Sequence, residues 1–205
     1  MGTKQWKTKW DQRYASGDFV FGREPNQFLK NQVHQLPLGK ILCAGDGEGR
    51  NGVWLARQGY DVISIDYSEV GLAKAHLLAA EYDVKIRFIH AEILEFDLMD
   101  LKLDGVVNIY LHMTGTEIIR MHEKYRNAIN PGGVLLAEVY SKEQLQYCSG
   151  GPKSIEALYD IEYFKRDFGD WNRLYLAQEI INLNEGNGHN GAASVVRVVL
   201  QKPQD

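Results

Sequence analysis

The sequence predicts an α/β fold in which helices cover both faces of a mostly parallel sheet. Between residues 40 and 140, short apolar segments alternate with longer segments whose apolar residues recur at helical spacing. A chain with this alternation forms parallel strands joined by crossover helices. After residue 141, two long segments of alternating polarity predict an antiparallel hairpin at one edge of the sheet.

The composition is that of an ordinary globular protein, with 44% hydrophobic and 24% charged residues. The net charge of -4 argues against a nucleic-acid partner, and no apolar run reaches the roughly 18 residues of a membrane span. The lysines of residues 1–10 precede no apolar segment, so we expect no secretory signal. Cys43 and Cys148 suggest neither a disulfide framework nor a metal site, so we expect a cytoplasmic protein without metal.

We expect a single domain over residues 1–205, because no linker or repeat divides the chain. Its parts are an N-terminal helical segment (1–37), a core (38–140), and a C-terminal helix with a hairpin (141–205).

In the N-terminal segment, residues 9–14 predict one or two helical turns, and residues 16–25 form an irregular stretch rich in glycine and aromatic residues. A helix is predicted over residues 26–35, because Asn26 follows a proline and suits the N-cap position.

The core alternates strands and helices that end at recognisable residues. Gly59 ends one helix, Ser68 caps the next, and the Asn-Pro-Gly-Gly sequence at 130–133 forms a sharp turn. Strands are predicted at 41–44, 61–66, 86–90, 103–109 and 134–140, and helices at 50–58, 68–81 and 116–129.

In the C-terminal part, residues 155–167 predict a helix. Residues 173–183 and 193–200 predict the two hairpin strands, and the connector at 184–191 is rich in glycine and asparagine.

The candidate ligand site is the turn Gly-Asp-Gly-Glu-Gly-Arg-Asn at 45–51, between the first strand and its helix. Alternating glycines let a ligand approach the backbone closely. Asp66 ends the next strand, where an acid can accept both hydroxyls of a ribose. A dinucleotide loop requires glycine where Arg50 stands, and there is no Gly-Lys-Ser/Thr motif. The turn therefore suits a nucleoside ligand without a pyrophosphate.

Residues 41–51, together with 59–62 and 65–68, resemble the first two motifs of class I S-adenosylmethionine-dependent methyltransferases. The Pro-Gly-Gly sequence at 131–133 also matches this class. The Gly-Glu-Gly-Arg-Asn form of the turn is similar to the tellurite-resistance and thiopurine methyltransferase-like branch. The segments Trp-Asp-Gln-Arg-Tyr and Phe-Gly-Arg-Glu-Pro near the N-terminus resemble that branch as well.

The resemblance implies a Rossmann-like, doubly wound sheet of seven strands in the order 3-2-1-4-5-7-6, with the hairpin as its last two strands. It also implies S-adenosylmethionine as cofactor and a small-molecule methyl acceptor. In this class, Glu92 and Ile93 fall beside the adenine, and residues 108–110 fall beside the methionine and the methyl group. The implied cofactor-binding residues are Gly45, Asp46, Gly47, Gly49, Asn51, Asp66, Tyr67, Glu92, Ile93, Asn108 and Ile109.

One residue departs from the family pattern. Cys43 stands where the family has an acid that helps to hold the amine of the methionine moiety. Asp46 and Glu48 are the candidates to replace it.

A soft nucleophile such as a thiolate needs no base for methyl transfer, whereas a hydroxyl or a protonated amine does. We name His112 and Tyr110, at the end of the fourth strand, as catalytic candidates. His189 is another candidate base, although its connector predicts a solvated side chain. Glu138 lies inside the fifth strand, where we expect it to pair with a buried donor.

Two segments are candidate walls of the site. The aromatic residues Trp10, Tyr14, Phe19 and Phe21 suit a lid over the cofactor, and the loop 148–152 follows the end of a strand.

Three other functions remain open at this point. An NAD-dependent oxidoreductase is disfavoured by Arg50, and a non-catalytic S-adenosylmethionine-binding protein is kept open by Cys43. A nucleic-acid methyltransferase is disfavoured because residues 108–111 read Asn-Ile-Tyr-Leu rather than an Asn/Asp-Pro-Pro-Tyr motif.

Overall fold

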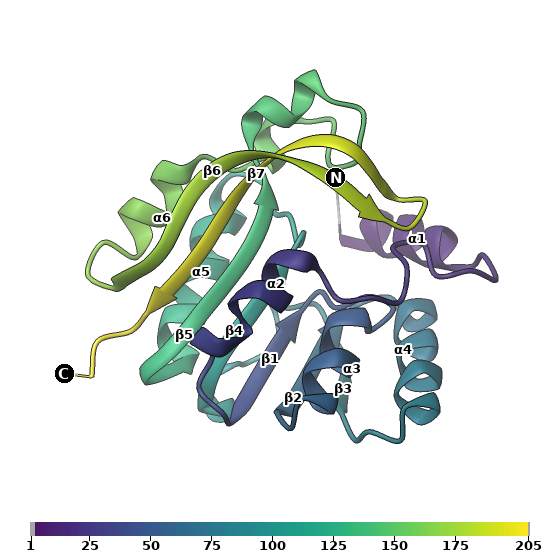
Figure 1. Ribbon diagram of the computed structural model, residues 1–205, viewed down its shortest axis with the longest axis horizontal. Coiled ribbons are helices and arrows are strands. Elements are labelled where there is room, and N and C mark those ends of the chain that lie inside the picture. The colour runs from purple at the N-terminus through teal and green to yellow at the C-terminus, as the bar shows by residue number, and fades with distance from the viewer. Residues whose placement is uncertain (1–2, 205) are drawn as a thin grey trace.

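Seven strands form one sheet in the predicted order, β3-β2-β1-β4-β5-β7-β6 (Figure 1). The computed structural model describes residues 3–204, so the first two residues and Asp205 lie outside the described residues. The strands are β1 (Lys40–Ala44), β2 (Asp61–Asp66), β3 (Arg87–His90), β4 (Leu103–Ile109), β5 (Ile129–Tyr140), β6 (Asn172–Glu185) and β7 (His189–Gln201). The α-helices are α1 (Thr3–Tyr14), α2 (Gln27–Gln32), α3 (Arg50–Arg57), α4 (Glu69–Glu81), α5 (Thr116–Ala128) and α6 (Ile161–Asp167). Short 3₁₀ turns are η1 (Val33–Gln35), η2 (Met99–Leu101), η3 (Lys142–Gln146) and η4 (Ile155–Ala157).

The strand directions create a ligand crevice beside β1. Strand β1 pairs in parallel with both β2 and β4, while β7 runs antiparallel to β5 and β6. The strand order reverses between β1 and β4, and the carboxyl ends on both sides of such a point form the usual ligand crevice of an open α/β sheet.

Both faces of the central strands β1, β4 and β5 are buried, as the apolar runs predict. Leu42 and Ala44 of β1 pack in the same cluster as apolar residues of α5 and α6. Ile41 and Cys43 point to the opposite face, where the cluster includes residues of α2 and α3. Successive side chains of a strand alternate between faces, so one short strand contributes to both layers. None of the described helices has the length and apolar character needed to cross a membrane.

The predicted helix over 155–167 is shorter than expected. Only Ile161–Asp167 is α-helical, and Asp160 caps it by accepting a hydrogen bond from the backbone of Glu162. The preceding residue, Tyr159, is held extended because its N–H donates to the carbonyl of Tyr140 at 2.9 Å. This bridge to the end of β5 prevents the helix from starting earlier.

The predicted turn at 130–133 lies inside β5 rather than before it. Strand β5 begins at Ile129, and Gly132 takes a left-handed φ of +78° within it. The bend is held by Lys202, whose N–H donates to the carbonyl of Gly133 and whose carbonyl accepts from Gly132. The glycine pair therefore bends a strand that the C-terminal segment stabilises.

The hairpin is longer than predicted, and its tip reaches the N-terminal segment. Only residues 186–188 separate β6 from β7. The N–H of Gly188 donates to the carbonyl of Val20 at 3.0 Å, which ties the tip to the stretch after α1 (Figure 1). The hairpin and the N-terminal segment thus meet above the carboxyl end of the sheet.

Candidate functional site

The glycine turn joins β1 to α3 through backbone that other elements approach closely. Gly45, Gly47 and Gly49 have φ values of +62°, +56° and +85°, a region that favours glycine. A Cβ atom on Gly47 would lie 2.5 Å from the hydroxyl of Tyr14. The predicted strand, turn and helix are therefore all present, and the turn needs glycine for both conformation and space.

Three backbone N–H groups of the turn donate hydrogen bonds to carbonyl groups of the protein itself. Gly45 and Asp46 donate to the carbonyl of Ile65 at 2.8 and 3.3 Å, and Gly49 donates to the carbonyl of Asp46 at 3.0 Å. A loop that binds pyrophosphate instead directs several free N–H groups at the anion. This arrangement fits a nucleoside without a pyrophosphate and disfavours the dinucleotide alternative.

Asp66 is joined to the glycine turn. Its Oδ2 accepts a hydrogen bond of 2.8 Å from the N–H of Gly47, and its Oδ1 accepts one of 2.8 Å from Ser68. Burial raises the pKa of the Asp66 carboxyl to about 6, although these hydrogen bonds oppose the shift. The predicted ribose-binding acid thus lies at the end of β2, directly beside the turn.

Two predicted cofactor-binding residues have side chains with internal partners. Asp46 accepts hydrogen bonds from the hydroxyl of Ser64 at 2.9 Å and the N–H of Gly52 at 3.3 Å. Asn51 accepts from the N–H of Asn26 at 2.9 Å. Burial raises the pKa of Asp46 to about 6. Both side chains brace the turn from within the protein.

The position of the missing family acid faces the core. Cys43 is 1% exposed in the apolar cluster on one face of the sheet, and burial raises the pKa of its thiol. Glu48, a candidate replacement, accepts hydrogen bonds of 2.8 Å from both the N–H of Val20 and the ammonium of Lys74. Glu48 therefore anchors the N-terminal segment and α4 to the turn, and Asp46 is engaged as described above.

The residues implied for adenine binding lie after β2 and β3. Ile93 is buried, and Tyr67 and Glu92 are partly buried. The N–H of Ala91 donates to the carbonyl of Asp66 at 3.1 Å, so the two segments are tied together. Burial raises the pKa of Glu92. These residues therefore lie at the same edge of the sheet as the ribose-binding acid.

The carboxyl end of β4 presents Tyr110. The residue has a φ of +58°, and its hydroxyl donates to Glu138 at 2.5 Å. Its ring stacks on Tyr140 with the centroids 4.6 Å apart. Asn108, just before it, is buried and accepts a hydrogen bond from the N–H of Leu111 at 3.2 Å. Ile109 between them is buried, so each of the three residues has partners within the protein.

Both ring nitrogens of His112 have partners. Nδ1–H donates to the carbonyl of Ala157 at 2.7 Å, and Nε2 accepts from the N–H of Tyr140 at 3.3 Å. Burial lowers the pKa of His112 to about 4, so the ring is neutral at pH 7. In this arrangement neither nitrogen is free to take a proton from an acceptor, and the catalytic role of His112 stays a prediction.

His189 does not lie in a solvated loop, and that expectation was wrong. It begins β7 and is 5% exposed. Its ring lies 4.4 Å from that of Phe21 and 4.5 Å from that of Tyr110, and its Nδ1 lies 3.3 Å from Glu185. The prediction failed because the glycine-rich connector resembles a long loop, whereas the two strands continue almost to the tip of the hairpin.

A buried polar network crosses this end of the sheet. Glu138 accepts a hydrogen bond of 2.6 Å from the guanidinium of Arg197, which confirms the prediction that it pairs with a buried donor. Glu185 pairs with Arg50 at 2.8 Å. Asn26 donates through Nδ2 to both carboxylates, at 2.6 and 2.9 Å. Each carboxylate therefore has its own guanidinium, and Asn26 joins α2 to β5 and β6.

The two segments predicted as walls of the site, the aromatic N-terminal segment and the loop 148–152, both lie near the glycine turn or His189. Trp10 stacks on Tyr14 at 5.4 Å and lies 6.3 Å from Phe21, while Phe19 faces the ammonium of Lys74. A Cβ atom on Gly150 of the loop 148–152 would lie 2.9 Å from Cδ2 of His189.

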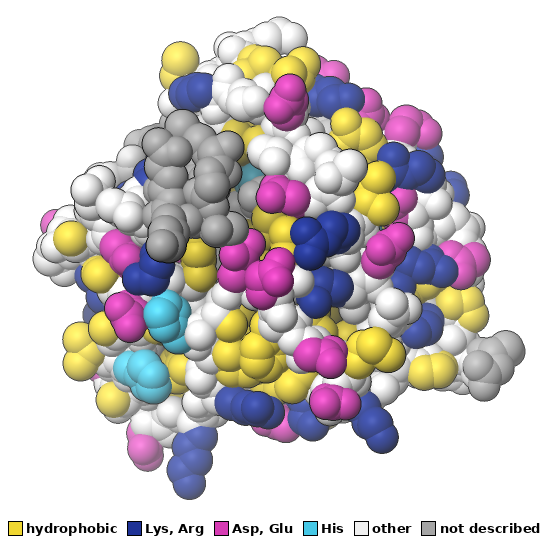
Figure 2. Space-filling view, turned by 180° about the vertical axis from the view of Figure 1, so that it is seen from behind, with side chains coloured by type: hydrophobic (Ala, Val, Ile, Leu, Met, Phe, Trp, Pro, Cys, Tyr) yellow, Lys and Arg dark blue, Asp and Glu magenta, His cyan; other side chains and the backbone are white. Residues whose placement is uncertain are grey.

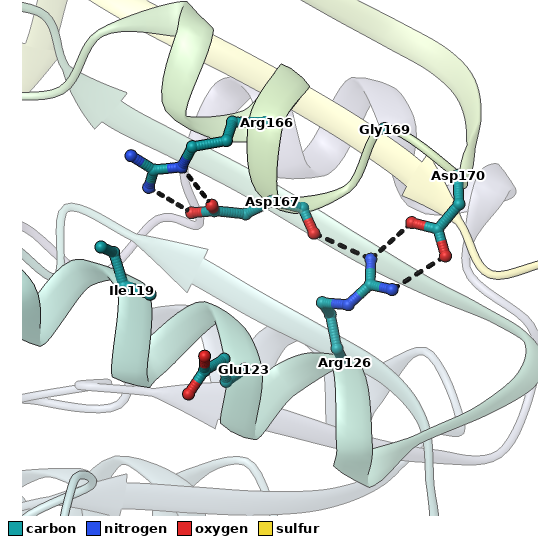
Figure 3. A pocket seen from close by; sticks show the side chains of 7 residues that line it. All are labelled: Ile119, Glu123, Arg126, Arg166, Asp167, Gly169 and Asp170. Atoms are coloured by element: carbon teal, nitrogen blue, oxygen red, sulfur yellow. Dashed lines mark hydrogen bonds and ion pairs between the residues drawn. The ribbon is translucent and has the colours of Figure 1, made fainter.

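A cavity of about 360 Å³ lies elsewhere, between α5 and the end of α6 (Figure 3). Arg126 makes two hydrogen bonds to Asp170, and Arg166 makes two to Asp167. None of the predicted site residues lines this cavity. Within residues 3–204, no group of three or more metal-ligating side chains is found.

Residues 41–133 match the model of a family described as a methyltransferase domain. A search of curated protein sequences finds no match.

Several solved structures share the fold at low identity. One comes from a study of the conversion of a disulfide bond into a thioacetal group during echinomycin biosynthesis, with 17% identity, a TM-score of 0.75, and coverage of 100% of this chain and 94% of that chain. TehB from Haemophilus influenzae is 17% identical with a TM-score of 0.71, covering 96% and 66%. The N-methyltransferase NodS from Bradyrhizobium japonicum WM9, in complex with S-adenosyl-L-homocysteine, is 13% identical with a TM-score of 0.71, covering 96% and 98%.

The family match contains the glycine turn, Asp66 and the carboxyl end of β4, the three features whose geometry fits a nucleoside ligand at the switch point of the sheet. Residues 41–133 are therefore matched to a methyltransferase domain, and the chain as a whole shares its fold with S-adenosylmethionine-dependent methyltransferases.

Proposed function

We propose that the protein methylates a small-molecule acceptor at the carboxyl end of β4. The observation that carries this proposal is the contact between Phe21 and His189, whose rings are 4.4 Å apart. This contact joins the N-terminal segment to the hairpin tip beside Tyr110. An acceptor enclosed by these two segments must be small, because a macromolecular strand or a folded protein needs an open groove.

The charge of the protein supports the same acceptor class. The net charge is -4, and on the face drawn in Figure 2 basic and acidic side chains are interspersed. A nucleic-acid acceptor requires a basic stripe or patch. We therefore do not propose nucleic acid as the substrate.

The proposed cofactor contacts follow the edge of the sheet. Asp66 holds the ribose hydroxyls, and Tyr67, Glu92 and Ile93 surround the adenine. The backbone at Gly45, Gly47 and Gly49 borders the methionine moiety, together with Asn108 and Ile109. Asp46 and Asn51 act indirectly in this proposal, because their hydrogen bonds to Ser64, Gly52 and Asn26 hold the turn in shape.

The bound cofactor supplies an electrophilic methyl group on a sulfonium, so the protein mainly aligns the acceptor and excludes water. Tyr110 is proposed to border the reacting methyl, because its ring is fixed by Tyr140 and its hydroxyl by Glu138. His112 is proposed to act by position, since it holds the backbone of Tyr140 through Nε2.

We also propose that residues 1–205 form one domain, that the protein is cytoplasmic, and that it falls in the tellurite-resistance and thiopurine methyltransferase-like branch. The branch is supported by its N-terminal motif, which packs on the glycine turn through Tyr14 and Glu48.

Calorimetric titration and a turnover assay together test the proposed function. We expect S-adenosylhomocysteine and S-adenosylmethionine to bind, NADH not to bind, and methyl transfer to occur to at least one member of a panel of thiols, phenols, amines and tellurite. Binding without turnover of any of these probes, combined with methylation of a protein or RNA, would contradict the small-molecule acceptor.

A further inference from the structure

His189 is brought to the proposed reaction centre by the hairpin. It is the first residue of β7, and its ring lies edge-on to Tyr110 at 4.5 Å and to Tyr140 at 5.5 Å. Phe21 covers another side of the ring at 4.4 Å. A histidine so placed contacts Tyr110, the residue that directly follows β4 and borders the proposed methyl position.

Glu185 orients the imidazole. The Nδ1 of His189 lies 3.3 Å from Oε2 of Glu185, and the carboxylate is itself fixed by Arg50 at 2.8 Å and Asn26 at 2.9 Å. Burial raises the pKa of Glu185, but the hydrogen bond with His189 and the Arg50 guanidinium outweigh it and lower the pKa to about 2. A carboxylate at Nδ1 favours the tautomer with hydrogen on Nδ1, which leaves the lone pair on Nε2. Among residues 3–204, Nε2 has no hydrogen-bond partner, in contrast to both nitrogens of His112.

The charges around His189 point to a neutral acceptor. Glu138 is paired with Arg197 and Glu185 with Arg50, so neither carboxylate is left to attract an ammonium group. The aromatic rings of Phe21 and Tyr110 suit a planar apolar body. A neutral acceptor that must lose a proton, and that carries a planar body, is an aryl hydroxyl.

We propose that His189, oriented by Glu185, is the general base for methylation of an acceptor with a phenol-type hydroxyl. The proposal rests on the proposed function and adds the base and the acceptor class. Nε2 of His189 takes the hydroxyl proton as the oxygen–carbon bond forms and the carbon–sulfur bond of the donor breaks with its electrons passing to sulfur. The products are the aryl methyl ether, S-adenosylhomocysteine and an imidazolium that the Glu185 carboxylate stabilises.

The pH dependence of the step reflects every charged or titratable group that faces His189. Burial lowers the pKa of His189, and Glu185 partly offsets this shift. The facing groups are Glu185, Arg50, Arg13, His112, Tyr110 and Tyr140. With phenol as acceptor, kcat/KM is expected to rise with pH and level off at or below pH 6.5.

The test compares phenol with thiophenol in the wild-type protein and in His189→Asn, with the exposed His34→Asn as control. Thiophenol is ionised at pH 8 and needs no base. We expect His189→Asn to lower kcat/KM for phenol by about 100-fold or more and for thiophenol by less than about threefold. The rising limb of the phenol pH profile should also disappear, while His34→Asn should match the wild type.

A measurement on the unliganded wild-type protein needs no turnover. Nitrogen-15 NMR of the histidine rings should show His189 with hydrogen on Nδ1, and Glu185→Gln should change this signal. Equal losses with both acceptors, methylation of thiophenol but not of phenol, or hydrogen on Nε2 would overturn the proposal. Failure to bind S-adenosylhomocysteine would instead overturn the proposed cofactor site, so the two failures are distinguishable.

Discussion

The Asp66 carboxylate accepts a 2.8 Å hydrogen bond from the backbone N–H of Gly47, so the end of β2 is tied to the turn that follows β1. The same acid is the proposed partner of the ribose hydroxyls. The position of the carboxylate and the shape of the glycine turn therefore depend on each other.

Asp66→Asn is expected to weaken S-adenosylhomocysteine binding by roughly 10- to 100-fold, the range for one hydrogen bond to a charged group. Wild-type affinity should fall as the pH is lowered through about 6, because burial raises the Asp66 pKa to that value and the protonated acid is a poorer acceptor. The variant should lose this pH dependence. Calorimetry between pH 5 and 8 checks both points. Asp61→Asn, at the exposed start of the same strand, is the control. An unchanged affinity in Asp66→Asn would remove Asp66 from the cofactor site.

Gly49→Ala is expected to lower the free energy of unfolding by about 2–4 kcal/mol, from backbone strain and overpacking together. Gly49 has a φ of +85°, and an added Cβ would lie 2.6 Å from the Cβ of Ala75. Gly59→Ala separates the two effects, since Gly59 has a φ of +93° and nothing within 4 Å of an added Cβ. Urea denaturation should show a smaller loss there, about 1 kcal/mol. Equal losses would mean that contact with α4 contributes nothing.

One of the two thiols should react with DTNB in the folded protein. Cys148 is exposed, whereas Cys43 is buried and its pKa is raised by burial, so its thiolate is scarce and inaccessible. We expect one fast equivalent that Cys148→Ser abolishes, and a second equivalent only after unfolding. Rapid reaction of Cys43 would show that this position opens toward the cofactor site, where the family acid stands.

Asp167→Asn is expected to lower the free energy of unfolding by about 2 kcal/mol at pH 7. Asp167 is paired with Arg166 (Figure 3). It is also paired with His122 at 2.7 Å, and its pKa is lowered to about 2. A lowered pKa stabilises the fold above the unfolded value of 3.8, and this stabilisation is lost as the pH falls toward 2. The difference between wild type and variant in urea denaturation should therefore shrink below pH 4.

The matched control for Asp167 is Asp170→Asn, at the more exposed ion pair of the same cavity. The Asp170 side chain is 63% exposed, and pairs of this kind contribute less than about 1 kcal/mol. A loss in Asp167→Asn no larger than this would show that the buried pair with His122 adds little.

The positions of the strands along the chain and the location of the turn were predictable because they depend on local patterns. Strand β1 reads as a continuous apolar run, and the alternating glycines mark backbone with positive φ. Asp66 was predictable for the same reason, since it directly ends an apolar strand. The start of α6 was not, because the extended conformation of Tyr159 depends on a hydrogen bond to Tyr140.

The sequence by itself determined the α/β class and the position of the glycine turn, because periodicity and turn chemistry act over a few neighbouring residues. Through its resemblance it also indicated the sheet order and the residues proposed to border the cofactor. Only the tertiary structure decided which polar side chains are engaged and which are free. In the folded protein, both ring nitrogens of His112 have hydrogen-bond partners, and His189 is buried beside Tyr110. Asn26 donates hydrogen bonds to both Glu138 and Glu185. These partners lie up to 159 positions apart, and a single sequence carries no signal for such pairings.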